Sequence, residues 1–161
     1  MTEVERNIEP LRKQLLSAFA AVPRPSNDRI ALHDCTECAQ VRRDYASQAP
    51  ASFDREIVKV HFDSLPLLSP EAFRYFVVAH MTYALEWPDS TVAEFVLYAL
   101  APKEFDDFYR ERFALFSSEQ RHAVIAFLEF MRSQQIDPEE GADREREPEI
   151  TAGIDVWRSL A

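Results

Sequence analysis

The chain has 161 residues, about the size of one domain, and its 47% hydrophobic and 29% charged composition is typical of a globular protein. Its net charge of −10 disfavours nucleic acids and anionic membranes as partners, and no apolar run reaches the ~20 residues needed to cross a bilayer. Both glycines, Gly141 and Gly153, lie near the C-terminus, so residues 1–140 contain none. Phosphate-binding loops, dinucleotide-binding turns and nucleophile elbows all need glycine, which excludes the common enzymes built on them.

The first 64 residues predict two or three helices. Apolar residues at helical spacing indicate a helix that ends near Ala21 and starts either near Thr2 or near Glu9, because Pro10 is unfavourable inside a helix. A loop is expected over residues 22–29. A second helix should begin at Asp34, which would form a capping pair with Glu37. Residues 51–62 fit a helix or a strand, and we predict a helix because no neighbouring segment offers a strand to pair with.

Residues 70–87 predict an apolar helix at the centre of the fold. Ser69 can cap it, Pro70 suits its first turn, and Pro88 stops it. One face carries His80 together with Phe73, Phe76, Val77, Tyr83, Ala84 and Trp87. Since apolar residues also occupy much of the other side, we expect helices to pack around it.

The rest of the chain predicts three further helices and a tail. One follows Asp89 or Ser90 and ends before Pro102, and the next carries the aromatic residues of segment 105–116. Ser117 and Gln120 form a capping box for a third helix. Seven acidic residues and two arginines in 137–149 predict a flexible acidic linker over 136–149. A short helix over 150–161 would then fold back or insert into a groove of a partner.

These elements predict an all-α protein, a compact bundle of six to seven helices around the central one. Residues 1–135 would form a single domain, followed by the linker and the final helix. The charged N-terminus lacks the apolar core of a signal peptide, so we expect a cytoplasmic protein.

The most explicit chemical motif is His33-x-Cys35-x-x-Cys38. Two thiolates at this spacing can bind one zinc ion, with His33 as a third ligand and His61 or His80 as a fourth. The complete zinc signature has two such pairs, and this chain has one. A second interpretation is a dithiol at a helix start, although negative charge from Asp34 and Glu37 would oppose thiolate formation. A third is that both cysteines are small structural residues.

Two other histidines, His80 and His122, are candidate site residues. His80 lies at the centre of an apolar face, and a buried imidazole needs a hydrogen-bond partner or a metal, of which the first is the commoner case. Glu119-x-x-His122 has the spacing of di-iron helical bundles, which need two such motifs. Glu119 and His122 face away from Val124 and Phe127, which indicates a solvated surface.

Three segments together resemble an uncharacterised bacterial domain family of unknown function: the His-x-Cys-x-x-Cys motif (33–38), LPLLSPEAFRYFVVAHMTYAL (65–85) and FYRERFALFSSEQRHAVIAFLEFM (108–131). The resemblance covers roughly residues 10–135. It implies a free-standing bacterial cytoplasmic domain and assigns no catalytic residue.

The leading functional prediction is a small non-catalytic binding or regulatory protein that acts through protein contacts. The alternatives are a zinc-binding protein that uses His33, Cys35 and Cys38, and a dithiol redox switch at Cys35 and Cys38.

Overall fold

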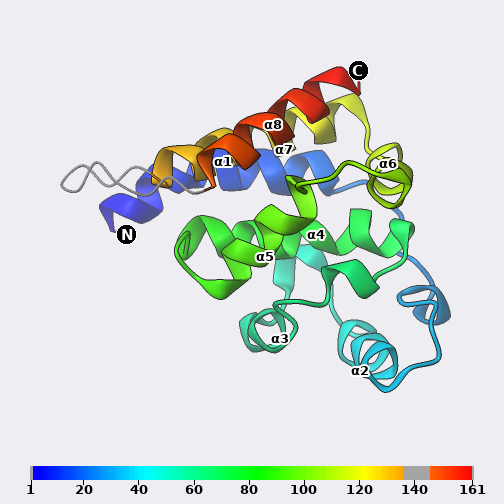
Figure 1. Ribbon diagram of the computed structural model, residues 1–161. Coiled ribbons are helices and arrows are strands. Elements are labelled where there is room, and N and C mark those ends of the chain that lie inside the picture. The colour runs from blue at the N-terminus through cyan, green and yellow to red at the C-terminus, as the bar shows by residue number, and fades with distance from the viewer. Residues whose placement is uncertain (1, 136–145, 161) are drawn as a thin grey trace.

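The computed structural model describes residues 2–135 and 146–160, and these residues form eight α-helices and no strand (Figure 1). The helices are α1 (Glu3–Phe19), α2 (Thr36–Tyr45), α3 (Arg55–Val60), α4 (Pro70–Glu86), α5 (Thr91–Leu100), α6 (Asp107–Phe113), α7 (Ser118–Gln134) and α8 (Glu147–Ser159). Short 3-10 turns span Asn27–Arg29, Pro50–Ser52 and Leu65–Leu67. The predicted all-α class is confirmed, and in the described part of the chain no helix has the length and apolar character to cross a membrane.

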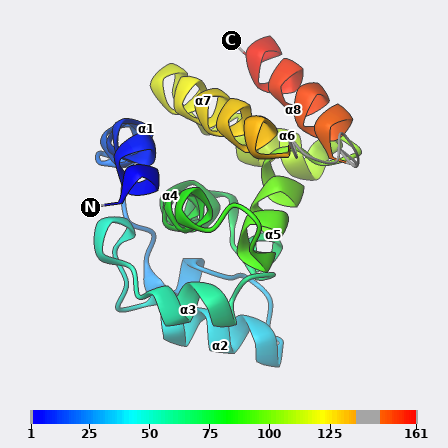
Figure 2. The same cartoon turned by 90° about the vertical axis from the view of Figure 1, so that its left-hand side faces the viewer.

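Helix α4 lies at the centre of the molecule, as predicted. Figure 2 shows it nearly end-on, with α1, α7, α5 and α3 around it. The Ser69 hydroxyl accepts the Ala72 N–H at 3.1 Å and caps the helix, and His80 is fully buried. Trp87, predicted on the same face as His80, is instead 52% exposed, because the helix ends at Glu86 and the backbone turns at Trp87.

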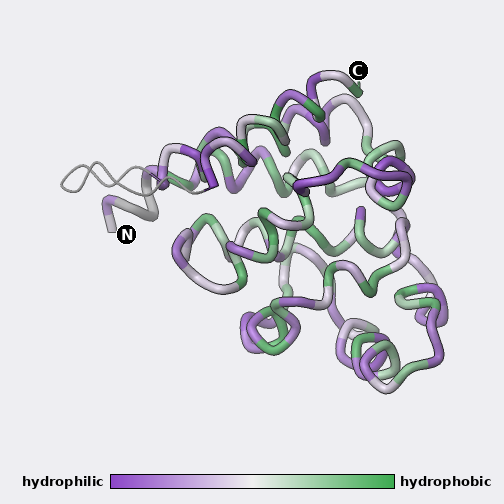
Figure 3. Tube along the Cα trace, viewed as in Figure 1, coloured by the Kyte–Doolittle hydropathy of each residue, from purple (hydrophilic) through white to green (hydrophobic). Residues whose placement is uncertain are grey.

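Helix α1 continues through Pro10 from Glu3, so the longer of the two predicted starts is correct. Leu15 and Phe19 of this helix are buried, and the helix packs against α4 and α7. The outer helices carry both hydrophobic and hydrophilic residues, as expected for amphipathic helices (Figure 3).

The predicted capping box at the start of α7 is confirmed, and its glutamine also joins three helices. The Gln120 N–H donates to the Ser117 hydroxyl, and the Ser117 N–H donates to Gln120 Oε1 at 2.9 Å. The same Oε1 accepts from Arg74 Nε of α4 at 3.0 Å, and Gln120 Nε2 donates to the Ala18 carbonyl of α1 at 3.1 Å. A local helix-start signal therefore also fixes how α7 sits on α1 and α4.

Helix α8 lies along α7 (Figures 1 and 2). Ile150, Ile154 and Trp157 are buried, and Trp157 Nε1 donates to the Leu100 carbonyl of α5 at 2.8 Å. The helix begins at Glu147, three residues before the predicted start, and residues 136–145 of the predicted linker lie outside the described residues.

Candidate functional site

The two cysteines of the His-x-Cys-x-x-Cys motif occupy the start of α2. Cys35 is exposed and is the N-cap residue, and its Sγ accepts the Cys38 N–H at 3.3 Å. The predicted cap at Asp34 is therefore wrong by one residue, because the sulfur of Cys35 supplies the acceptor instead. Cys38 is buried and His33 is exposed.

Among the described residues no group of three or more His, Cys, Asp or Glu side chains could hold a metal ion. The two histidines considered as a fourth ligand bond to other partners: His61 to Asp44 and Ser64, and His80 to Tyr45. Zinc binding by His33, Cys35 and Cys38 stays a prediction.

His80 is a buried core histidine, as predicted. Its Nε2 lies 2.7 Å from the Tyr45 hydroxyl, and its Nδ1 is buried with no hydrogen-bond partner among the described residues. Burial lowers the pKa of His80 to about 3 and raises that of Tyr45 above its ordinary value. Both groups are therefore neutral near pH 7.

A chain of hydrogen bonds that sequence analysis missed connects Asp44, His61 and Ser64. His61 Nε2 lies 2.7 Å from Asp44 Oδ2, and His61 Nδ1 lies 3.0 Å from Ser64 Oγ. Hydrogen bonds from Gln40 and His61 lower the pKa of Asp44. His61 and Ser64 are only 5% and 4% exposed, so the three groups hold the end of α2 against the turn after α3. The three-residue spacing from His61 to Ser64 was visible in the sequence, whereas the contact with Asp44 spans 17 residues.

Glu119 and His122 are exposed on α7, as predicted for a solvated surface. Neither residue contributes to a site in the structure.

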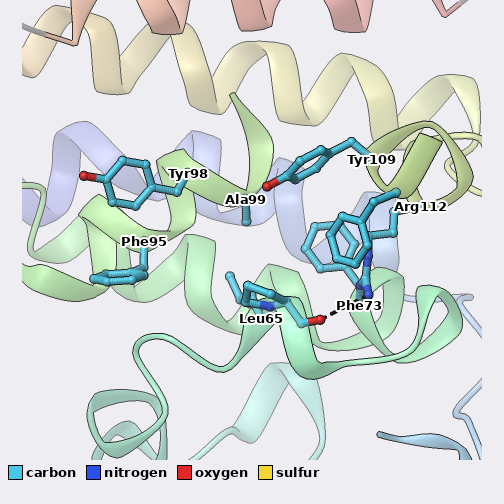
Figure 4. Close-up of a pocket in the computed structure, with 9 residues that line it drawn as sticks. Leu65, Phe73, Phe95, Tyr98, Ala99, Tyr109 and Arg112 are labelled. Atoms are coloured by element: carbon cyan, nitrogen blue, oxygen red, sulfur yellow. Dashed lines mark hydrogen bonds between the residues drawn. The ribbon is translucent and has the colours of Figure 1, made fainter. Parts of the chain in front are cut away.

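A small pocket of about 40 Å³ opens between α4, α5, α6 and the 3-10 turn Leu65–Leu67 (Figure 4). Aromatic rings supply most of its wall, and Arg112 is the charged residue among them. Phe108 and Tyr98 are 42% and 39% exposed, so aromatic surface reaches solvent at this place. The lining consists of Leu65, Pro66, Phe73, Phe95, Tyr98, Ala99, Phe108, Tyr109 and Arg112.

Arg112 reaches this wall from α6 and is only 5% exposed. Its Nη2 donates to the Leu68 carbonyl at 2.5 Å and to the Pro66 carbonyl at 3.3 Å. The guanidinium carbon lies 4.1 Å from the ring centroid of Phe108 and 5.4 Å from that of Phe73. These contacts join α6 to the segment that precedes α4.

Two of the three guanidinium nitrogens of Arg112, Nε and Nη1, are buried and have no hydrogen-bond partner within the described residues. Among the side chains that the structure describes, no carboxylate forms an ion pair with Arg112, whose hydrogen bonds go to backbone carbonyls. Burial lowers its pKa to about 10, so the side chain is still positively charged near pH 7. A buried charge of this kind is normally paired.

Sequence analysis missed this site because it assigned all the aromatic residues of segment 105–116 to one helix. The helix covers only Asp107–Phe113, and Phe105 and Phe116 lie outside it. Phe113 is buried, but Phe108 on the same helix is exposed. Arg110 and Arg112 lie between Phe108 and Phe113 in the sequence. A charged residue among these aromatic residues was the feature that could have indicated the site.

The fold and this pocket define a small all-helical domain with a buried, unpaired arginine in an aromatic site. The chain belongs to a family of unknown function, DUF6714, whose model matches residues 11–147. The match includes both cysteines and the whole pocket, and extends twelve residues beyond the predicted limit of 135, to the first residue of α8. No curated protein and no solved structure matches the chain.

Proposed function

We propose that the protein is a non-catalytic binding protein that recognises a partner through the Arg112 pocket. The partner group is a carboxylate attached to an apolar side chain. The observation that supports the proposal is the pair of buried, unpartnered nitrogens, Nε and Nη1, in an aromatic pocket. We also infer a bacterial cytoplasmic setting, as composition and the family resemblance indicate.

The energetic argument concerns the cost of an unpaired buried charge. A buried donor without an acceptor costs about 1–3 kcal/mol, and more when the group is charged. A ligand carboxylate would accept hydrogen bonds from Arg112 and also neutralise it. The free protein already has the unfavourable free energy of these unpaired donors. Ligand binding would remove it, and this gain would add to the binding energy.

Phe108 controls access to the guanidinium. Its ring stacks on Arg112 and is itself 42% exposed, whereas the unpartnered nitrogens beneath are covered. We propose that rotation of this side chain opens a path from solvent to them. Loss of the stacking contact, about 0.5–2 kcal/mol, is the cost of opening.

The lining of the pocket favours an apolar group with a carboxylate as occupant. Its volume of about 40 Å³ is far below the 300–1,000 Å³ typical of ligand pockets, so a partner side chain would enter only when Phe108 moves aside. Aromatic walls suit an aromatic or aliphatic group, and one anchor residue in a pocket often dominates a protein interface. The C-terminal residue of a partner chain offers both parts, an apolar side chain and a free carboxylate.

The test uses N-acetyl-phenylalanine and its C-terminal amide, which differ only in the carboxylate. We expect the acid to shift the NMR signal of the Arg112 Nε–H group in a saturable way. The amide should bind at least about tenfold more weakly, since one hydrogen bond to a charged group contributes about 1.5–3 kcal/mol.

Arg110→Met is the matched control for Arg112→Met, because Arg110 lies on the same helix but is exposed and pairs with Asp107. Binding should be lost in Arg112→Met and retained in Arg110→Met, with folding of each checked by circular dichroism. Phe108→Ala should bind the acid at least as well as the natural chain. Equal binding of acid and amide by the natural chain and by Phe108→Ala, or no binding of either, would refute the proposal.

A further inference from the structure

We propose that Cys35 and Cys38 form a second functional site, a dithiol that exchanges with disulfides, in which Cys35 attacks and Cys38 resolves. This site lies at the start of α2, and its chemistry does not depend on the Arg112 pocket.

The two thiols differ in exposure in the way that such exchange requires. Cys35 is exposed at the N-cap position, where a disulfide from outside can reach its sulfur. Cys38 follows within the first turn and is 0% exposed. An external disulfide therefore meets Cys35 first, while Cys38 needs only to reach its neighbour.

Hydrogen bonds at the helix start favour the thiolate of Cys35. The pKa of Cys35 is lowered chiefly by a hydrogen bond from the Cys38 side chain and then by the Cys38 backbone N–H, whose distance to Sγ is 3.3 Å. The charge of Glu37 acts in the opposite direction, as predicted, but it is a smaller effect. Burial raises the pKa of Cys38, in the direction opposite to the shift of Cys35.

The loop that carries Cys35 is held by the helix that follows it. Arg42 Nη1 donates to the Ala31 carbonyl at 2.7 Å and to the His33 carbonyl at 2.9 Å. Residues 31–33 are therefore tied to α2 on the approach to Cys35. Because the side chain of a later turn holds this loop, the two cysteines have a defined relative position.

The reaction consumes a disulfide of a small thiol or of a protein. The Cys35 thiolate attacks one sulfur, an S–S bond forms, and one thiolate leaves. Cys38 then loses its proton and attacks Cys35 Sγ, which releases the second thiolate. The two cysteines lose two electrons and two protons, and the external disulfide becomes two thiols.

The experiment treats the reduced full-length protein with oxidised glutathione and follows its mass. The natural chain should lose about two hydrogens and keep no glutathione adduct. Cys38→Ser should accumulate one stable adduct on Cys35. Cys35→Ser should react at least about tenfold more slowly, because its remaining thiol is buried.

Three results would overturn the proposal. One is a lasting glutathione adduct on the natural chain, and another is an adduct on Cys38 that forms as fast as one on Cys35. The third is about one equivalent of bound zinc that blocks both thiols, which would support the metal prediction instead. Circular dichroism of each variant separates a change in reactivity from a loss of folding.

Discussion

The buried pair of Tyr45 and His80 predicts that the protein loses stability as the pH falls from 7.5 to 5. His80 is fully buried, and burial lowers its pKa in the folded state to about 3. In the unfolded chain the pKa returns to about 6.5. Below that value the unfolded state binds a proton that the folded state does not, so the free energy of unfolding decreases.

The magnitude follows from the two pKa values. Each pH unit between them changes the free energy of unfolding by about 1.36 kcal/mol. At pH 5 the solution is about 1.5 units below the unfolded pKa and still above the folded one. His80 alone should therefore reduce stability by about 2 kcal/mol relative to pH 7.5, which is a large part of the 5–15 kcal/mol typical of a domain.

Urea unfolding at pH 7.5 and pH 5 measures this difference. His80→Gln should remove about 2 kcal/mol of the pH dependence, whereas His122→Gln, at an exposed position of α7, should leave it unchanged. Tyr45→Phe keeps the imidazole, so it should retain the pH dependence while it loses about 1–3 kcal/mol at both pH values through the unpaired Nε2. The same pH dependence in His80→Gln and in the natural chain would refute the reasoning.

The remaining predictions concern packing and capping. A Cβ atom at Gly153 would lie 2.5 Å from the Cβ of Ala101, and neither atom can rotate away. Gly153→Ala should therefore cost about 1–3 kcal/mol of overpacking against about 1 kcal/mol of gained helix propensity, and the added variant Ala101→Gly should restore part of the loss in a double-mutant cycle of urea unfolding, since the Ala101 Cα stays 3.0 Å from the new Cβ. A single Gly153→Ala variant about 1 kcal/mol more stable than the natural chain, the gain expected from helix propensity alone, would contradict this packing. Ser117→Ala removes one half of the capping box and should lower the thermal midpoint by the equivalent of about 1 kcal/mol, while Ser118→Ala on the same turn should have little effect.

The parts of the fold that the sequence predicted correctly depend on neighbours along the chain. The Ser69 cap and the Ser117–Gln120 box each span only four residues, and the periodicity of α4 lies within one helix. The helix start at Cys35 was misplaced because aspartate is the usual cap, whereas the local backbone directs the cysteine sulfur at the Cys38 N–H. Residue preferences therefore predict which residue types cap a helix, whereas the backbone geometry decides which position becomes the cap.

The candidate site depended on contacts that no local pattern contains. Arg112 reaches carbonyls 44 and 46 residues earlier in the chain, at Leu68 and Pro66. Its burial results from the short length of α6 and from where that helix docks, and neither follows from the aromatic spacing. The cysteine pair shows the opposite case, since spacing revealed the motif and the structure added the difference in exposure.

Residues 1–140 contain no glycine, and several arginine side chains there donate hydrogen bonds to backbone carbonyls. Helices commonly end with a glycine in a left-handed conformation, which satisfies the last free carbonyls. At the end of α2 the side chain of Arg24 donates to carbonyls of this kind, and other arginines donate to backbone carbonyls in the loops before α2, α4 and α7. The donors and acceptors are Arg24 to Tyr45, Ala46 and Gln48; Arg42 to Ala31 and His33; Arg112 to Pro66 and Leu68; and Arg121 to Phe116.

Arg112 differs from the other arginines in one respect, which distinguishes a role in ligand binding from a purely structural role. Arg24, Arg42 and Arg121 also donate to carbonyls, but only Arg112, among the residues that the structure describes, has buried guanidinium nitrogens with no partner. Support of the loop before α4 uses only Nη2 and would not require the other two nitrogens to be enclosed by aromatic rings. The unused nitrogens therefore argue for an anionic ligand, and the comparison of Arg112→Met with Arg110→Met measures binding separately from the structural role.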